Sequence, residues 1–400
     1  MSKPKVFEKP TGVKDYLPEA AAKLRSIEFK VMQCMERWGY REIITPTLEY
    51  YDTVGVASST EDRKLFKLLD RNGTTLVLRS DMTAPIARVV SSLLRDYRFP
   101  LRLSYHANVF RAIEAEAGRD AEFFQAGVEL VGDASSESDA EVIALAVACL
   151  KAAGVQPFKI AVGHVGFLSG LFQETLHDRQ DAQLQLKACL LSRDYVGYRE
   201  TLKALELPDS VEAELGGILR LRGGQEICGQ AQQLTNDPVA QAAIEHLCQM
   251  WDVLEAYGVS EHVMIDLTMI GDFSYYTGMT FEGYASDHGF PVCSGGRYDN
   301  LLAQFGRPAP ATGFALKTNR ILEVVGKGAV HEEGSRVLIV YTAANRGPAL
   351  AKAGALRGEG HAAVETLLVA DSGEYESAAQ PDGSVVVRGV AYRSVIEFVK

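Results

Sequence analysis

Alternating apolar and polar positions predict two strands in the first half of the chain, over Leu101–Phe110 and Glu122–Val131. Because strand side chains alternate, Gln125, Gly127 and Glu129 share one face of the second strand, and the other face is apolar. An amide and a carboxylate on either side of a glycine suggest the floor of a pocket. The alternative is an edge strand with a solvated face. Taken alone, this stretch favours the edge strand.

Apolar residues at three- and four-residue spacing predict helices elsewhere. One is expected from Pro18 to Gly39, since proline suits a first turn and glycine a C-terminal end. Ser80 or Asp81 is expected to cap another. Residues 166–258 keep this spacing almost throughout, which predicts an inserted helical module.

A stretch rich in glycine and charge after residue 325 predicts a linker between two domains, 1–325 and 335–400. The second domain is expected to be a small α/β unit. Its predicted order is a strand over Val337–Tyr341, a helix over Pro348–Arg357, a strand, another strand over Ser384–Arg388, and a final helix.

The composition of the chain argues against several classes of protein. The 400 residues are 47% hydrophobic, and the formal net charge of −11 argues against a general nucleic-acid binder. The six cysteines and eight histidines are scattered without metal-ligand spacing, so neither a metal nor a cofactor is expected. A reduced, cytoplasmic setting is the simplest interpretation. No apolar run is long enough to predict contact with a membrane.

Six segments in order carry a family resemblance that covers residues 7–325. They are WGYREIITPTLEY, LRSDMTAPIAR, VFRAIEAEAGRDAEFFQAGVELVG, SYYTGMTFE, SGGRYDNLL and TGFALKTNRIL. In this order they resemble the motifs of the histidine-tRNA ligases, which are class II aminoacyl-tRNA synthetases. The resemblance implies an α+β fold, with a six- or seven-stranded antiparallel sheet flanked by helices. It also implies a self-dimer formed through the first segment.

The resemblance implies a histidine pocket. Gln125 and Glu129 match the positions that receive the imidazole and α-amino groups, and Asp81 and Thr83 match the turn that also holds the amino group. Arg111 matches the arginine that meets the carboxylate or α-phosphate. Each residue alone could be structural, but their joint agreement favours a pocket. The aromatic positions that would close it are Tyr275, Tyr276 and Tyr298.

The same comparison indicates that catalytic groups are lost. Gly271 stands where the family has an arginine, Ser274 where it has an aspartate, and Ile113 where it has an ATP-facing glutamate. Lys317 replaces a small glycine and is expected to fill the adenine side, although Arg320 is kept. Losing one preorganised group of this kind costs roughly 3–4 kcal/mol of transition-state stabilisation. Ligase activity is therefore not expected. The short C-terminal unit also makes binding of tRNA doubtful.

A retained amino-acid pocket beside a broken ATP site is similar to the pattern of the regulatory subunits of ATP phosphoribosyltransferase, paralogues of the ligases. This resemblance implies assembly with a short-form catalytic subunit, and histidine as the feedback-inhibiting ligand of the first step of histidine biosynthesis. Two alternatives remain: an active histidine-tRNA ligase with altered residues, and a stand-alone histidine-sensing module.

Overall fold

The computed structural model describes residues 7–399, with the exception of 113–119, 271–274, 287, 327–335, 360–362 and 372–374. It divides into two compact units, residues 1–328 and 329–400. This boundary falls where the sequence places the linker.

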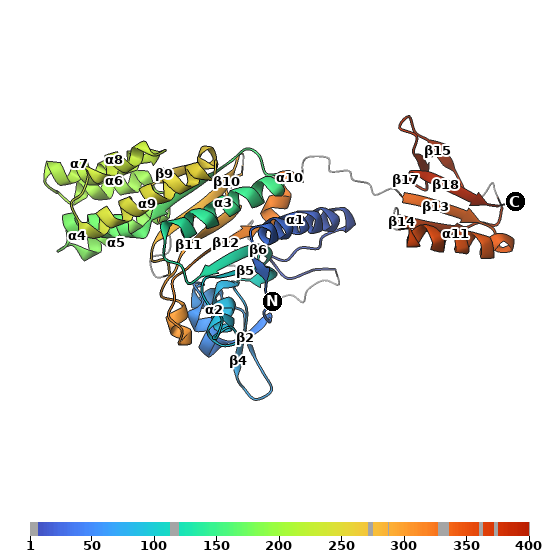
Figure 1. Ribbon diagram of the computed structural model, residues 1–400, viewed down its shortest axis with the longest axis horizontal. Helices are drawn as coiled ribbons and strands as arrows, with labels where there is room; N and C mark the ends of the chain where they lie inside the picture. The colour runs from blue at the N-terminus through green and yellow to red at the C-terminus, as the bar shows by residue number, and fades with distance from the viewer. Residues whose placement is uncertain are drawn as a thin grey trace. The chain divides into compact units, whose positions relative to one another are not determined.

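The first unit is built on a nine-stranded sheet with the order β1-β5-β6-β12-β11-β10-β7-β9-β8 (Figure 1). All neighbouring pairs are antiparallel except β1 with β5 and β7 with β9. The predicted antiparallel core is confirmed, and the sheet is wider than expected because two-residue strands extend both edges. The strands are β1 Arg41–Glu42, β5 Leu101–Phe110, β6 Glu122–Val131, β7 Phe158–His164, β8 Arg222–Gly223, β9 Val263–Asp266, β10 Met279–Ala285, β11 Cys293–Arg297 and β12 Ala311–Lys317.

Strand β6 lies inside the sheet, between β5 and β12. Its apolar face packs into the main core, where Ala126, Val128 and Leu130 have no exposed surface. Its polar face is covered as well, since Gln125 and Glu129 are only 4% and 2% exposed. The edge-strand interpretation is therefore wrong.

Helices cover the apolar face of the sheet (Figure 1). Helix α1 (Pro18–Arg37) packs against α3 (Ser136–Ala152) and α10 (Thr318–Val325), and α3 also contacts β12. Proline occupies the first turn of α1, and Ser135 caps α3 by accepting a hydrogen bond from the Ser138 amide.

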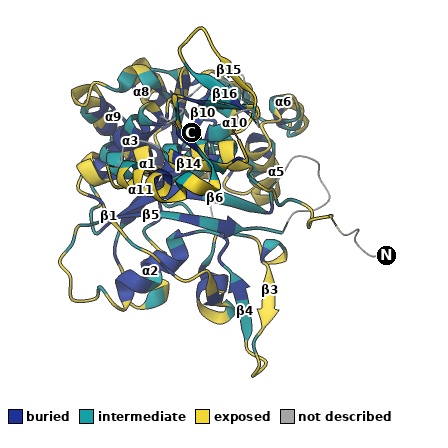
Figure 2. Cartoon of the chain, turned by 90° about the vertical axis from the view of Figure 1, so that its right-hand side faces the viewer, coloured by how far each residue is buried: buried dark blue, intermediate teal, exposed yellow. Residues whose placement is uncertain are grey.

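A second, smaller core surrounds α2 (Thr83–Ser91). A three-stranded sheet of order β2-β4-β3 lies beside it, and its strands are β2 Leu48–Tyr50, β4 Thr75–Leu78 and β3 Lys67–Leu69. A hairpin that turns at Asn72-Gly73 joins β3 to β4, and Gly73 has a φ of +82°. Strand β3 is exposed along its length (Figure 2).

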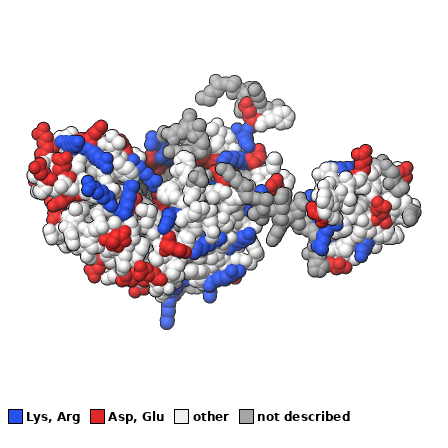
Figure 3. All heavy atoms as spheres, turned by 90° about the horizontal axis from the view of Figure 1, so that it is seen from above, with Lys and Arg blue, Asp and Glu red and all other residues white. Residues whose placement is uncertain are grey.

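The helical insertion contains six helices of the described residues, with acidic and basic side chains interspersed on the face in Figure 3. Asp237 caps the longest of them, accepting hydrogen bonds from Val239 N and Ala240 N. None of the described helices has both the length and the apolarity to span a membrane. The six are α4 Val165–Leu176, α5 Gln180–Leu191, α6 Tyr195–Ala204, α7 Asp209–Gly217, α8 Glu226–Gln232 and α9 Pro238–Ala256.

Short helical turns join several of these elements. Five are 3-10 turns and one is a π turn. They are the π turn η1 Tyr51–Gly55, and the 3-10 turns η2 Asp62–Lys64, η3 Ile218–Arg220, η4 Ser260–His262, η5 Leu302–Phe305 and η6 Ala343–Asn345.

The second unit has a parallel sheet of order β14-β13-β18, with α11 (Arg346–Gly358) against it, and a separate antiparallel sheet. The predicted final helix is wrong, because residues 394–398 form β18. There Ile396 pairs with Ile339 of β13, and such branched side chains favour a strand. The strands are β13 Arg336–Tyr341, β14 Ala363–Leu368, β18 Ser394–Phe398, β15 Ser377–Ala379, β16 Val385–Val387 and β17 Val390–Tyr392.

Candidate ligand-binding site

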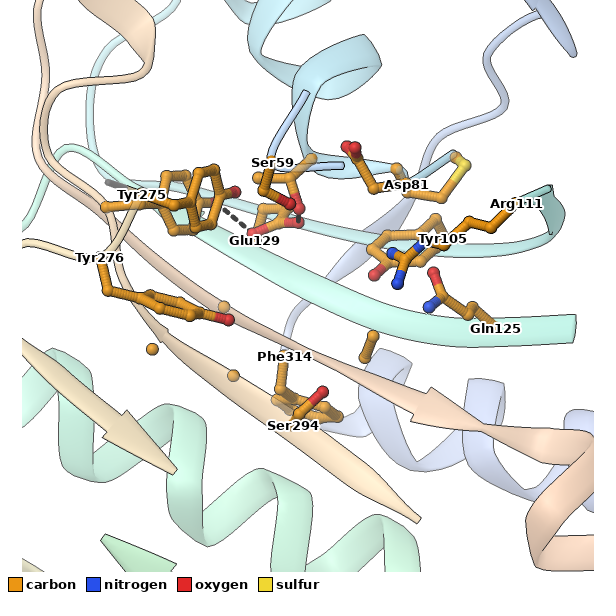
Figure 4. A pocket seen from close by; sticks show the side chains of 17 residues that line it. Ser59, Asp81, Tyr105, Arg111, Gln125, Glu129, Tyr275, Tyr276, Ser294 and Phe314 are labelled. Atoms are coloured by element: carbon orange, nitrogen blue, oxygen red, sulfur yellow. Dashed lines mark hydrogen bonds between the residues drawn. The ribbon is translucent and has the colours of Figure 1, made fainter. Parts of the chain in front are cut away.

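One cavity of about 90 Å³ lies over the polar face of the sheet, beside the start of α2 (Figure 4). All eight residues predicted from the sequence line it, although they come from distant parts of the chain. They are Asp81, Thr83, Arg111, Gln125, Glu129, Tyr275, Tyr276 and Tyr298.

The floor of the cavity depends on a glycine of β6. A Cβ atom on Gly127 would lie 2.2 Å from the carbonyl oxygen of Phe314 and 2.5 Å from the hydroxyl oxygen of Tyr105. Glycine therefore lets Tyr105 of β5, its partner in the sheet, lie directly over the strand. The group that approaches the backbone at this glycine is thus the side chain of Tyr105.

Glu129 is held by two hydroxyl groups. Thr83 Oγ1 donates to Glu129 Oε1 over 2.8 Å, and the Tyr298 hydroxyl donates to Oε2. Burial raises the pKa of Glu129 to about 8 and the charge of Asp81 adds to the rise, whereas the two hydrogen bonds oppose it. Among the described residues, no cation pairs with this carboxyl group.

Asp81 supplies a second carboxylate at the start of α2. Its Oδ1 accepts a hydrogen bond from Ala84 N over 3.0 Å, and its Oδ2 accepts from the Ser58 hydroxyl. Asp81 thus satisfies one amide of the first turn of α2, but the N-cap position is Met82, and not Ser80 or Asp81 as predicted. The carboxylate also lines the cavity, so a ligand would meet acidic groups on two sides.

The tyrosines form an aromatic end of the cavity. Tyr275 stacks on Tyr298 with ring centroids 5.4 Å apart, and meets Tyr276 edge-on at 5.0 Å. The backbone of Arg297 holds this segment, since Thr277 N donates to its carbonyl oxygen over 2.8 Å. The Arg297 side chain is in turn paired with the buried Asp139, at 2.9 Å.

The opposite end of the cavity is cationic. Figure 4 shows Arg111 and Gln125 at this end, with Glu129 between them and the tyrosines. Arg111 Nε donates to the carbonyl oxygen of Ser80 over 2.9 Å, and burial lowers the pKa of its guanidinium. The cavity therefore joins an aromatic end, acidic groups and a cation, in an order that suits a small zwitterion carrying a ring.

The sequence analysis did not predict several of the residues that line the cavity. Ile113, Gly271 and Ser274, which stand where the family has catalytic groups, lie outside the described residues. Alternation along β5 and β11 could have placed side chains on this face, but the pairing of strands was needed to bring them to Gly127. No group of His, Cys, Asp or Glu among the described residues could hold a metal ion. The missed lining residues include Ser59, Tyr105, Ser294 and Phe314.

Comparison with known proteins identifies the family of this chain. The histidyl-tRNA synthetase family model matches residues 12–321. ATP phosphoribosyltransferase regulatory subunits are 45% identical in Halalkalibacterium halodurans, over 91% of both chains, and 46% identical in Bacillus subtilis, over 90% of this chain and 91% of that protein.

Solved structures give the same picture. One described as an ATP phosphoribosyltransferase regulatory subunit/histidyl-tRNA synthetase from Bacillus halodurans has a TM-score of 0.88 and 42% identity, with both chains fully covered. The histidyl-tRNA synthetase of Nostoc, at 20% identity, shares the fold with a TM-score of 0.78 over 91% of this chain and 86% of that one. The chain therefore belongs to the histidyl-tRNA synthetase family and, within it, to the ATP phosphoribosyltransferase regulatory subunits.

Proposed function

We propose that this chain assembles with a short-form ATP phosphoribosyltransferase catalytic subunit, and that it binds histidine to transmit feedback inhibition without aminoacylating tRNA. Family membership supports the partnership, since the relatives at 45–50% identity carry the regulatory-subunit name. We propose a self-dimer through the class II core as well, and we expect no tRNA to bind.

The observation that supports the proposal is the order of the groups along the cavity, which runs from an aromatic end through two carboxyl groups to a cationic end. Glu129 lies next to the tyrosines and Gln125 beside Arg111 (Figure 4), so we propose the reverse of the roles expected from the sequence. The tyrosines and Glu129 would receive the imidazole ring, and Asp81 with Gln125 would receive the α-ammonium group. Arg111 would meet the α-carboxylate. A ligand that lacks the ring would leave the aromatic end unfilled.

Loss of ligase chemistry is proposed from the sequence. Ile113, Gly271 and Ser274 cannot supply the charge or hydrogen bonds that adenylation needs on ATP. Each missing group is worth roughly 3–4 kcal/mol in the transition state, and losses within one site are not simply additive. Histidine would then be held as a signal and not activated.

Feedback inhibition requires histidine to bind the inhibited assembly more tightly than the active one. The same histidine pocket would serve a stand-alone sensor, so the partner must be tested directly. We expect the short-form catalytic subunit to co-purify with this chain, and histidine to inhibit the assembly.

The first experiment measures histidine-dependent exchange between ATP and pyrophosphate, together with calorimetric histidine binding. We expect binding without exchange, and robust exchange would instead identify an active ligase. Glu129→Ala should weaken binding about tenfold or more, because a buried ring nitrogen left without its hydrogen-bond partner costs about 1–3 kcal/mol. Glu122→Ala is the matched control, since residue 122 lies on the other face of the same strand.

A further inference from the structure

Lys317 ends β12 beside the cavity. Gly313 and Ala315 of the same strand line the cavity, and side chains alternate along a strand, so Lys317 shares their face. Its register partner on β6 is Gln125, which also lines the cavity. Lys317 therefore stands at the cationic end.

The ammonium group of Lys317 lies in an unfavourable environment. Burial, which is the largest cause, and the charges of Arg320 and Arg111 together lower its pKa to about 8, although Glu282 opposes them. Within the described part of the chain no carboxylate is in ion-pair distance of this ammonium. Glu282 pairs instead with Arg193, at 2.5 Å, and accepts from the Tyr284 hydroxyl.

Two neighbouring cations with so little compensation favour an anionic ligand group between them. Arg111 is fixed in place, because its Nε donates to the Ser80 carbonyl and its guanidinium lies 5.4 Å from the ring centroid of Phe123. A cavity of about 90 Å³ has room for roughly six to nine water-sized groups. That size suits an amino acid better than a nucleotide.

We propose that Lys317 is a specificity-determining residue, which together with Arg111 binds the free α-carboxylate of the amino acid in the cavity. The inference rests on the proposed histidine pocket and adds a residue to it. It replaces the expectation from the sequence that Lys317 fills the adenine side, because its register partner is Gln125 of the pocket. The cavity would then select histidine over derivatives in which the carboxylate is converted to an amide or an ester. A free end product would be sensed, and a carboxyl-modified one would not.

The experiment compares histidine with histidinamide by calorimetry on the full-length chain. Wild type should prefer histidine at least about tenfold, in keeping with one charge-assisted hydrogen bond. Lys317→Met should weaken histidine binding at least tenfold but change histidinamide binding less than about threefold. Lys317→Arg, which keeps the charge, should recover much of the preference. Binding of histidinamide shows that the variant site is folded.

The contrary outcomes are distinct. If Lys317→Met keeps the wild-type preference for histidine, Lys317 does not read the carboxylate. If inorganic phosphate or AMP displaces histidine from wild type but not from Lys317→Met, the lysine serves a phosphate, and the inference is overturned. If wild type binds neither amino-acid ligand, the proposed function itself fails.

Discussion

Glu129 is a titratable residue that is only 2% exposed, and burial raises the pKa of its carboxyl group to about 8. In the unfolded chain the group ionises near pH 4.5. Between these values the folded chain holds a proton that the unfolded chain has released. The stability of the ligand-free protein should therefore fall as pH rises from about 4.5 to 8, by at most about 1.4 kcal/mol per pH unit.

Glu129→Gln isolates this effect, since the amide has a similar shape and does not ionise. Urea unfolding of both proteins between pH 5 and 9 gives the difference in unfolding free energy. We expect the wild type to lose stability relative to the variant across this interval. Parallel pH profiles would show that Glu129 ionises normally in the fold.

Gly127 is the residue on which the shape of the cavity depends. Gly127→Ala would drive a methyl group against the Phe314 carbonyl and the Tyr105 hydroxyl. We expect a loss of about 1–3 kcal/mol in stability and at least tenfold weaker histidine binding, because Tyr105 must leave its position. Gly229→Ala in α8 is the control: nothing lies within 4 Å of its added methyl group, so a slight gain in helix stability is expected. Normal histidine affinity in Gly127→Ala would contradict the role given to Tyr105.

At the scale of elements, a buried ion pair ties the helices to the aromatic end of the cavity. Asp139 of α3 is fully buried and accepts from Arg297 of β11 at 2.9 Å and from His246 of α9 at 2.8 Å. Asp139→Ala would remove the buried carboxylate that pairs with Arg297 and leave, among the described residues, only Asp299, which lies 3.2 Å away and is 37% exposed. We therefore expect a loss of about 3 kcal/mol in urea unfolding, at the lower end for a broken buried pair. Histidine binding should weaken as well, because Tyr298 follows Arg297.

The control for Asp139→Ala is a more exposed pair between the insertion and the sheet. Arg193 contacts Glu282 of β10, and the side chains are 51% and 32% exposed. Arg193→Ala should cost no more than about 1 kcal/mol, because water screens the pair. Equal losses in the two variants would mean that burial does not set the strength of the Asp139 pair.

Local sequence patterns predicted the helices and strands themselves better than they predicted which of these elements lie next to one another. Alternation gave the bounds of β5 and β6, yet it favoured a solvated face for Glu129. The groups that cover this face, Thr83 and Tyr298, lie 46 and 169 residues away along the chain, beyond the reach of a local pattern. The family resemblance, and not the local pattern, brought the eight cavity residues together. The helix expected at the C-terminus failed for a similar reason, since the pairing of β18 with β13 decides its form.

At the scale of the whole molecule, the cavity belongs entirely to the first unit. Its lining residues run from Ser59 to Ala315, and the second unit begins at residue 329. The main core is likewise built from residues before 328. A chain ending at residue 328 should therefore keep the folded pocket, whatever the second unit contributes to the assembly.

We expect this shortened chain to bind histidine with an affinity within about twofold of the full chain, because every lining residue of the cavity is kept. Calorimetry on both proteins measures the ratio, and Glu129→Ala in the shortened chain confirms that the same pocket is occupied. Inhibition of the catalytic partner by histidine is a separate property, and the two can be dissociated. If binding is kept and inhibition is lost, the second unit carries the signal to the partner. A tenfold loss of binding would instead show that residues 329–400 stabilise the pocket itself, since linkage requires any such coupling to appear in the affinity.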